Sequence, residues 1–189
     1  MPPEQSRDKG LDDDVVMLLM AQHSRIRDLF AEVKHSQGQD KRDAFDRLVR
    51  LLAVHETAEE EVVHPLSRSA PGGTGVVQDR LAEEHSAKEK LQRLERLGPG
   101  CDEFDQLLEE LRHDVTKHAR AEERYEFMQL RQRSSPERLS TLATMVRAAE
   151  ATAPTHPHPG VETAGANLVA GPFAAIVDRV RDAMRNSAH

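Results

Sequence analysis

Apolar residues recur every three or four positions along four stretches of the chain, as they do on one face of an amphipathic helix. The first stretch runs from Val16 to Val33 and the second from Phe45 to Leu66. A third, less regular stretch lies between Val76 and Leu97, and a fourth follows between Phe104 and Tyr125. Short polar or glycine-containing connections join them, which is typical of antiparallel neighbours. The pattern predicts an all-α protein built as an antiparallel, up-down-up-down four-helix bundle.

The rest of the chain predicts extensions of this bundle. Residues 1–10 are expected to be a disordered head and residues 11–132 the bundle itself. Residues 133–151 predict a fifth helix, because a proline stands near the start and apolar residues follow at helical spacing. The Pro- and Gly-rich residues 152–171 are typical of a linker, and residues 172–189 predict a C-terminal amphipathic helix.

Composition and charge narrow the class of protein. A chain of 189 residues fits one domain with extensions. The single cysteine, Cys101, excludes a disulfide framework and fits a reducing compartment. No stretch reaches the length of a membrane span, and the formal charge of −7 disfavours a general affinity for nucleic acid. We therefore expect a cytoplasmic monomer or homodimer that binds neither membrane nor nucleic acid.

Two of the apolar stripes contain ionisable residues where Leu or Val would be expected. His55 and Glu59 interrupt the second stripe, and His118 and Glu122 interrupt the fourth. Residues at positions i and i+4 lie one turn apart on one helix face, so each pair can reach one point. A buried carboxylate without a partner costs several kcal/mol. Such pairs therefore predict a shared cation.

The other two stripes add one histidine each. His23 interrupts the first stripe, and His85 lies near the face of the third. Imidazole nitrogens and carboxylate oxygens suit Fe, Mn or Zn, and a carboxylate can bridge two ions. Four histidines and two glutamates from four helices fit two metal ions better than one.

These residues stand in segments that carry a family resemblance. The segments are QHSRIRDLF around His23, HETAEEEVVHP around His55 and Glu59, EEHSAKEKL around His85, and HARAEERYEF around His118 and Glu122. Across residues 15–130 the chain resembles a bacterial hemerythrin-like protein of the HHE cation-binding type. The resemblance implies two iron ions with an oxo or hydroxo bridge, for which Mn or Zn could substitute, and a small ligand such as O2, peroxide or NO. It assigns these six residues as the metal ligands.

The chain departs from oxygen-carrying hemerythrins, which have a second histidine on the third helix and an aspartate five residues after the last histidine. Position 81 is Leu, position 89 is Glu, and Glu122 follows His118 by four residues. A site richer in carboxylate favours the oxidised irons, which points to redox chemistry, catalase-like peroxide handling or sensing in an oxidative-stress response.

Other interpretations of the same residues stay open. A lone histidine on an apolar face is usually a core residue, and Glu59 and Glu122 could form salt bridges with Arg27 or Lys88 in a metal-free bundle. Several nearby residues receive weaker assignments. His64 and His113 are expected at the surface or flank of their helices, Glu89 as an extra ligand or an outer partner, and Tyr125 as core before a phenol that gates or tunes the site. The remaining glutamates are expected as solvated residues or hydrogen-bonding partners of the ligand imidazoles: Glu60, Glu61, Glu83, Glu84 and Glu123.

Three functions are compatible with such a site. The first is a redox protein that binds or turns over peroxide, O2 or NO. The alternative is a metal-dependent sensory or partner-binding module without turnover, in which the segment after residue 150 contacts the partner. A ferritin-like carboxylate oxidase is weaker, because that class places Glu three residues before His and the order here is reversed.

Overall fold

The computed structural model describes residues 14–69 and 72–152, and all regular structure within these ranges is helical. The predicted all-α class is confirmed. The predicted head, the linker after Thr152 and the C-terminal helix lie outside the described residues. No helix in the described part of the chain is long and apolar enough to cross a membrane.

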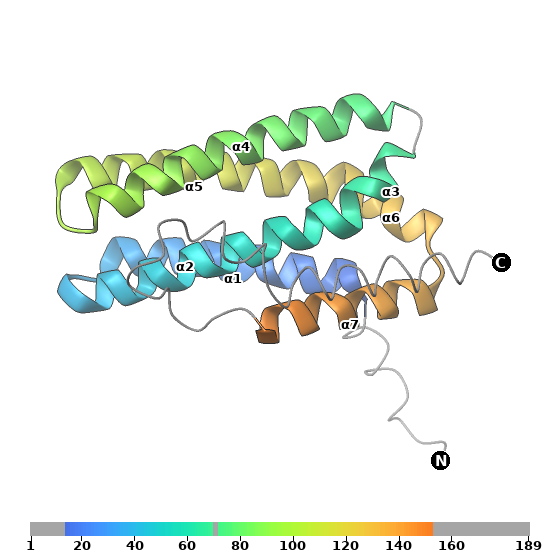
Figure 1. Ribbon diagram of the computed structural model, residues 1–189, viewed down its shortest axis with the longest axis horizontal. Helices are drawn as coiled ribbons and strands as arrows, with labels where there is room; N and C mark the ends of the chain where they lie inside the picture. The colour runs from blue at the N-terminus through green and yellow to red at the C-terminus, as the bar shows by residue number, and fades with distance from the viewer. Residues whose placement is uncertain (1–13, 70–71, 153–189) are drawn as a thin grey trace, which may run out of the picture.

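Figure 1 shows the long helices α1, α2, α4 and α5 running along the long axis of the molecule, with α7 against α1 and α2. The elements follow one another as α1 (Val15–His35), α2 (Gly38–Ala58), the π-helical segment η1 (Glu59–Val63), α3 (His64–Arg68), α4 (Gly73–Leu97), α5 (Asp102–Ala121), the π-helical segment η2 (Glu122–Glu126), α6 (Phe127–Arg133) and α7 (Pro136–Thr152). Helix α7 covers the segment for which a fifth helix was predicted.

Local sequence signals set several helix ends. The Asp14 carboxylate accepts a hydrogen bond from the backbone N–H of Val16 at 2.7 Å and so caps α1. Acidic side chains fill the first turn of α5, where they face the positive end of the helix dipole. Gly98 ends α4 with a φ of 69°, a backbone conformation that glycine adopts without steric cost.

The core consists of two apolar clusters with the ionisable residues between them. One cluster contains Phe30, Phe45 and Phe104, and the other contains Leu19 and Phe127. Along α1, the second cluster precedes His23 and the first begins at Ile26. The second cluster also includes apolar residues of α7, so this helix is an integral part of the fold. Apolar packing on both sides fixes the place of the polar residues.

Two π-helical segments interrupt the long helices, and each begins at a glutamate, Glu59 in η1 and Glu122 in η2. A π turn contains one residue more than an α turn, so it rotates all following side chains. The prediction that Tyr125 belongs to the core is wrong for this reason: its side chain is 56% exposed, whereas Glu126 and Phe127 are buried. Isolated π turns of this kind are frequent at functional sites.

The start of α4 lies against α3 so closely that it has no room for a side chain. A Cβ atom at Gly73 would lie 1.8 Å from the backbone oxygen of Ser67. We expect Gly73→Ala to lower the free energy of unfolding by about 3 kcal/mol, the upper end for overpacking, because backbone must move to relieve the contact. Urea denaturation followed by circular dichroism measures this loss.

Gly75→Ala is the matched control for that measurement. Gly75 lies in the same turn of α4, and a Cβ there meets nothing within 4 Å among the described residues. Alanine should stabilise this position by about 0.5–1 kcal/mol, because glycine loses more backbone entropy in a helix. Equal effects of the two substitutions would mean that the contact between α3 and α4 is not tight.

Candidate metal centre

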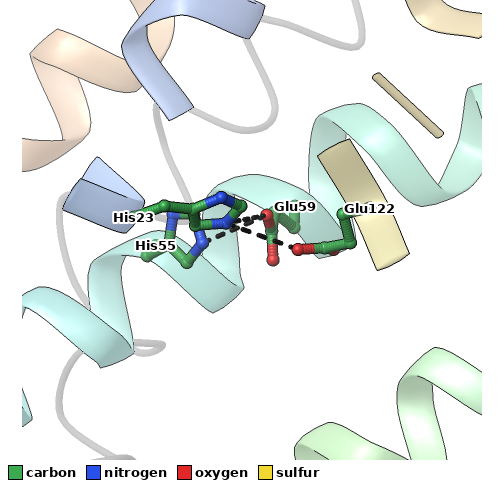
Figure 2. Close-up of side chains that lie close together, drawn as sticks. All are labelled: His23, His55, Glu59 and Glu122. Carbon is green, nitrogen blue, oxygen red and sulfur yellow. Dashed lines mark ion pairs between the residues drawn. The ribbon is translucent and has the colours of Figure 1, made fainter. Parts of the chain in front are cut away.

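Five of the six predicted ligands meet at one point between the helices. Glu59 lies at the centre: its carboxylate oxygens are 3.1 Å from His55 Nε2, 3.7 Å from His23 Nε2 and 3.8 Å from His118 Nε2. Glu122 approaches the same group, with its oxygens 3.4 Å from His23 Nε2 and 3.3 Å from His118 Nε2. Figure 2 shows His23, His55, Glu59 and Glu122 with their side chains directed toward one another.

Four of these five side chains are buried and His118 is 13% exposed, yet most of the atoms that they direct at the centre have no hydrogen-bond partner among the described residues. Glu59 and Glu122 are each 0% exposed, and none of their four carboxylate oxygens finds a hydrogen bond within the described ranges. The same holds for Nε2 of His23 and of His118. Leaving buried polar atoms unpaired costs about 1–3 kcal/mol each, and more for charged groups. Such a group of atoms fits a bound cation.

Hydrogen bonds from the opposite ring nitrogens hold three of the imidazoles in place. The Nδ1 atoms of His55, His23 and His118 donate to Gln22 Oε1 at 2.7 Å, Glu123 Oε1 at 2.8 Å and Glu83 Oε2 at 3.1 Å, respectively. Amide and carboxylate oxygens accept, so each Nδ1 carries the hydrogen and Nε2 faces the centre. Metal-binding histidines are usually held by their second nitrogen in this manner.

Without a metal, the centre holds protons instead. Burial lowers the pKa of His23, but the contacts with Glu122 and Glu59 outweigh it and raise the pKa to about 10. The same balance raises the pKa of His118 to about 12. Burial raises the pKa of Glu59, but the three neighbouring imidazoles bring it well below its usual range. In the metal-free protein, histidinium ions therefore neutralise the buried carboxylates that a metal would otherwise bind.

The ligand atoms fall into two groups that share Glu59. His23, His55, Glu59 and Glu122 form the first, with one potential ligand atom each within 4.8 Å of the others. Glu59, Glu84 and His118 form the second under the same limit. One carboxylate common to both groups is the arrangement expected of a residue that bridges two ions.

Comparison with known proteins agrees with this geometry. Residues 14–130 match the hemerythrin family described as the hemerythrin HHE cation binding domain. The chain belongs to this family. The matched family is a cation-binding domain, and this chain buries a group of histidines and glutamates that could hold an ion. The chain is therefore a metal-binding helical domain.

Two relatives of this hemerythrin-family chain differ in how much of their length it spans. It is 30% identical over 140 residues to a DNA nickase of Nostoc sp. (strain PCC 7120). That match covers 74% of this chain and 40% of the nickase. It is 28% identical over 166 residues to an uncharacterised hemerythrin-like protein of Schizosaccharomyces pombe, and this match covers 86% of the chain and 82% of the relative. No solved structure gave a significant match.

His85 is the one predicted ligand that the structure does not bring to the centre. Its side chain is 77% exposed and lies 3.6 Å from Glu89, which is 71% exposed. The buried face of α4 runs through Val77, Glu84 and Leu94, at spacings of seven and ten residues. His85 is one residue beyond that face, a rotation of about 100° on an α-helix.

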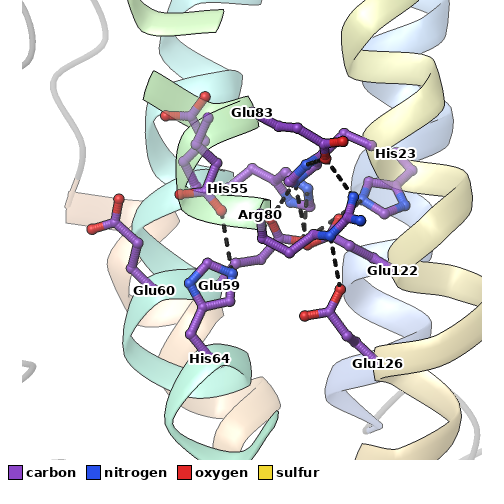
Figure 3. Close-up of polar contacts among 12 residues, drawn as sticks. His23, His55, Glu59, Glu60, His64, Arg80, Glu83, Glu122 and Glu126 are labelled. Carbon is purple, nitrogen blue, oxygen red and sulfur yellow. Dashed lines mark hydrogen bonds and ion pairs between the residues drawn. The ribbon is translucent and has the colours of Figure 1, made fainter. Parts of the chain in front are cut away.

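Three residues close to the centre were missed or misplaced by the sequence pattern. His64, Glu84 and Glu126 are at most 3% exposed, although His64 was predicted at the surface. In a straight α-helix His64 would lie half a turn from His55, since nine residues separate them. The extra residue of η1 returns it toward the centre. Figure 3 shows His64 and Glu126 grouped around the same centre as Glu59 and Glu122.

The salt-bridge alternative assigned two basic residues to the central glutamates, but both pair elsewhere. Arg27 lies 3.9 Å from Glu123, and Lys88 lies 2.8 Å from Glu60. Both basic side chains are about half exposed at the edge of the bundle. Glu83 and Glu123, in contrast, accept hydrogen bonds from the imidazoles of His118 and His23, respectively. This is one of the two roles predicted for them.

A cavity of about 310 Å³ adjoins the centre. His55, Glu59 and His118 are among its polar lining residues, and Leu52, Ala87, Val115 and Ala119 are among its apolar ones. One water molecule takes about 30 Å³ of liquid volume. The cavity is therefore large enough for a small oxidant beside bound ions.

Proposed function

We propose that the chain is a non-haem di-iron protein that binds and reacts with a small oxidant or gas, peroxide before O2 or NO, in a cytoplasmic response to oxidants. Its four long helices form the up-down-up-down bundle expected of hemerythrins. His23, His55, Glu59, His118 and Glu122 are ligands of two iron ions, for which manganese or zinc could substitute.

One observation carries this proposal: buried carboxylate oxygens and imidazole Nε2 atoms converge on one centre without hydrogen bonds among the described residues. A metal-free core of this kind would be expensive to fold, whereas two divalent cations would satisfy these atoms together. Bound iron would supply the electrons that a small oxidant accepts, and its positive charge would hold both oxygens of a peroxide.

The protein's own residues shape that chemistry in two ways. Gln22, Glu83 and Glu123 hold three imidazoles by Nδ1 and keep Nε2 directed at the centre. Two of these three acceptors are carboxylates, which raise the basicity of the imidazoles and favour a more oxidised metal. The apolar part of the cavity wall limits the water around a reacting molecule. Both features support redox chemistry over reversible O2 carriage.

Elemental analysis of natively purified protein tests the proposal, together with absorption spectra before and after addition of hydrogen peroxide. We expect two irons per chain, a near-ultraviolet band that changes with peroxide, and measurable loss of peroxide. His118→Gln should remove most of that loss. His113→Gln is its control, because His113 is exposed on the same helix. Protein that carries no metal, or zinc alone with no response to peroxide, would contradict the proposal.

The name of the Nostoc relative raises DNA as another substrate. The chain spans only 40% of that nickase, so the activity could belong to the part outside the match. The net charge of −7 does not favour binding to a phosphate backbone. The buried histidines and glutamates and the adjoining cavity suit reaction with a small oxidant. We therefore place this function before action on DNA.

A further inference from the structure

Helix α4 presents a glutamate, not a histidine, to the centre of the molecule. Glu84 is 3% exposed, and neither of its carboxylate oxygens has a hydrogen-bond partner in the described part of the chain. One of its oxygens lies within 4.8 Å of ligand atoms of both Glu59 and His118. The adjacent His85 points to solvent. A buried carboxylate directed at two metal-ligand residues is itself placed as a ligand.

His64 stands behind this carboxylate. Its Nε2 atom lies 3.2 Å from Glu84 Oε1, and its side chain is 2% exposed. The residue comes from α3, immediately after the π-helical segment η1 that begins at Glu59. Because α3 and α4 are in direct contact at Ser67 and Gly73, the position of His64 relative to Glu84 is fixed by packing. His64 can therefore orient Glu84, and it belongs to neither group of potential ligand atoms.

We propose that Glu84 is a ligand of the second metal position, with Glu59 and His118, that it replaces His85 in this role, and that His64 is its positioning residue. This inference rests on the proposed function, because it assigns ligands within the same two-metal centre. It makes the second position richer in carboxylate than the first, which has two histidines and two glutamates. The two ions are therefore held by different donor sets and are expected to bind with different affinities.

Calorimetric titration of the metal-free full chain with Co²⁺ separates the two positions. The wild type should take up two ions. Glu84→Gln removes the charge at nearly constant volume and should weaken the second ion by about tenfold or more, since even partners outside the ligand set change affinity by 10–100-fold. His85→Gln, one residue away, is the matched control and should still bind both ions with unchanged affinity. The first ion, held by His23, His55, Glu59 and Glu122, is an internal reference in every variant.

Glu84→Asp gives a second measurement if the glutamine variant lacks the helical circular dichroism of the wild type. It keeps the charge, withdraws the carboxylate by one methylene, and should also weaken the second ion. For His64, glutamine retains a hydrogen-bond donor and leucine does not. His64→Leu should weaken the second ion by about tenfold, and His64→Gln should restore most of that loss. A role in packing alone would affect both variants equally.

The outcomes distinguish this inference from the proposed function. If His85→Gln loses one ion and Glu84→Gln keeps both, the inference is wrong, whereas the two-metal centre stands. If the wild type binds no ion, both are wrong. If only Glu84→Gln and Glu84→Asp lose the second ion, the ligand set of this chain differs from the one its family resemblance implied.

Discussion

Replacing Glu59 by glutamine should leave the protein unable to hold either metal ion. Its two oxygens lie between three imidazoles, and it is common to both groups of potential ligands. Loss of a shared ligand weakens both positions, whereas loss of a ligand to one position weakens one. We expect metal content to fall from two ions to none after dialysis, measured by elemental analysis.

Glu60→Gln is the matched control for this variant. Glu60 follows directly in η1, but its side chain is 39% exposed and pairs with Lys88 at 2.8 Å. An exposed ion pair contributes about 0.2–1 kcal/mol, so this substitution should alter neither metal content nor fold appreciably. Two ions retained by a folded Glu59→Gln protein would show that Glu59 does not bridge the positions.

Thermal stability of the metal-free protein should fall steeply as pH rises from 6.5 toward 10. The folded-state pKa of His23, about 10, and that of His118, about 12, are above the unfolded value of 6.5. The folded protein therefore binds more protons than the unfolded chain above pH 6.5. The stability that these ion pairs contribute is fully present below 6.5 and is lost as pH rises through 10 and then 12.

Two carboxylates add to this trend at lower pH. Burial raises the pKa of Glu56 and that of Glu126 to about 7, from 4.5. Their contribution is fully present below 4.5 and is lost as pH rises through 7, so it has the same sign. The metal-free protein should thus be most stable in mildly acidic solution.

Circular dichroism melting in the presence of a chelator measures the effect. Each extra proton changes stability by about 1.4 kcal/mol per pH unit, and about 1 kcal/mol shifts Tm by roughly 2–4 °C in a chain of this size. His23 and His118 bind one extra proton each, so a slope of about −6 to −11 °C per pH unit is expected below pH 10. His118→Gln should reduce the slope, and His113→Gln should not. With metal the trend should reverse, because binding requires deprotonated imidazoles; equal slopes with and without metal would contradict the assignment.

The sequence pattern predicted those parts of the site that lie on regular α-helix before any interruption. His23 lies between Leu19 and Ile26 on an unbroken stripe, and all three residues are buried as expected. His55 and His118 likewise lie in the last turns of the regular helices α2 and α5. Apolar residues on both sides define which face of such a helix is buried, so an ionisable residue on that face is found directly.

The pattern failed where that condition was absent. On α4 few large apolar residues precede His85, so the buried face could not be placed to within one residue, and the burial of Glu84 was not singled out. Beyond Glu59 and Glu122, the π turns shift the register by one residue, which hid His64 and exposed Tyr125. No simple periodicity in the sequence marks a π turn, so the stripes alone could not reveal these shifts.

The centre also joins two halves of the molecule that otherwise touch more within themselves than with each other. Helix α1 packs mainly on α2, and α4 mainly on α5. The proposed ligands come from both pairs: His23 and His55 from the first, Glu84 and His118 from the second. Ions bound there would act as cross-links present only in the folded state, and their binding energy would add to its stability. The amount of folded protein in a cell would then follow the iron supply, so that scarcity of the metal would also remove the protein that uses it.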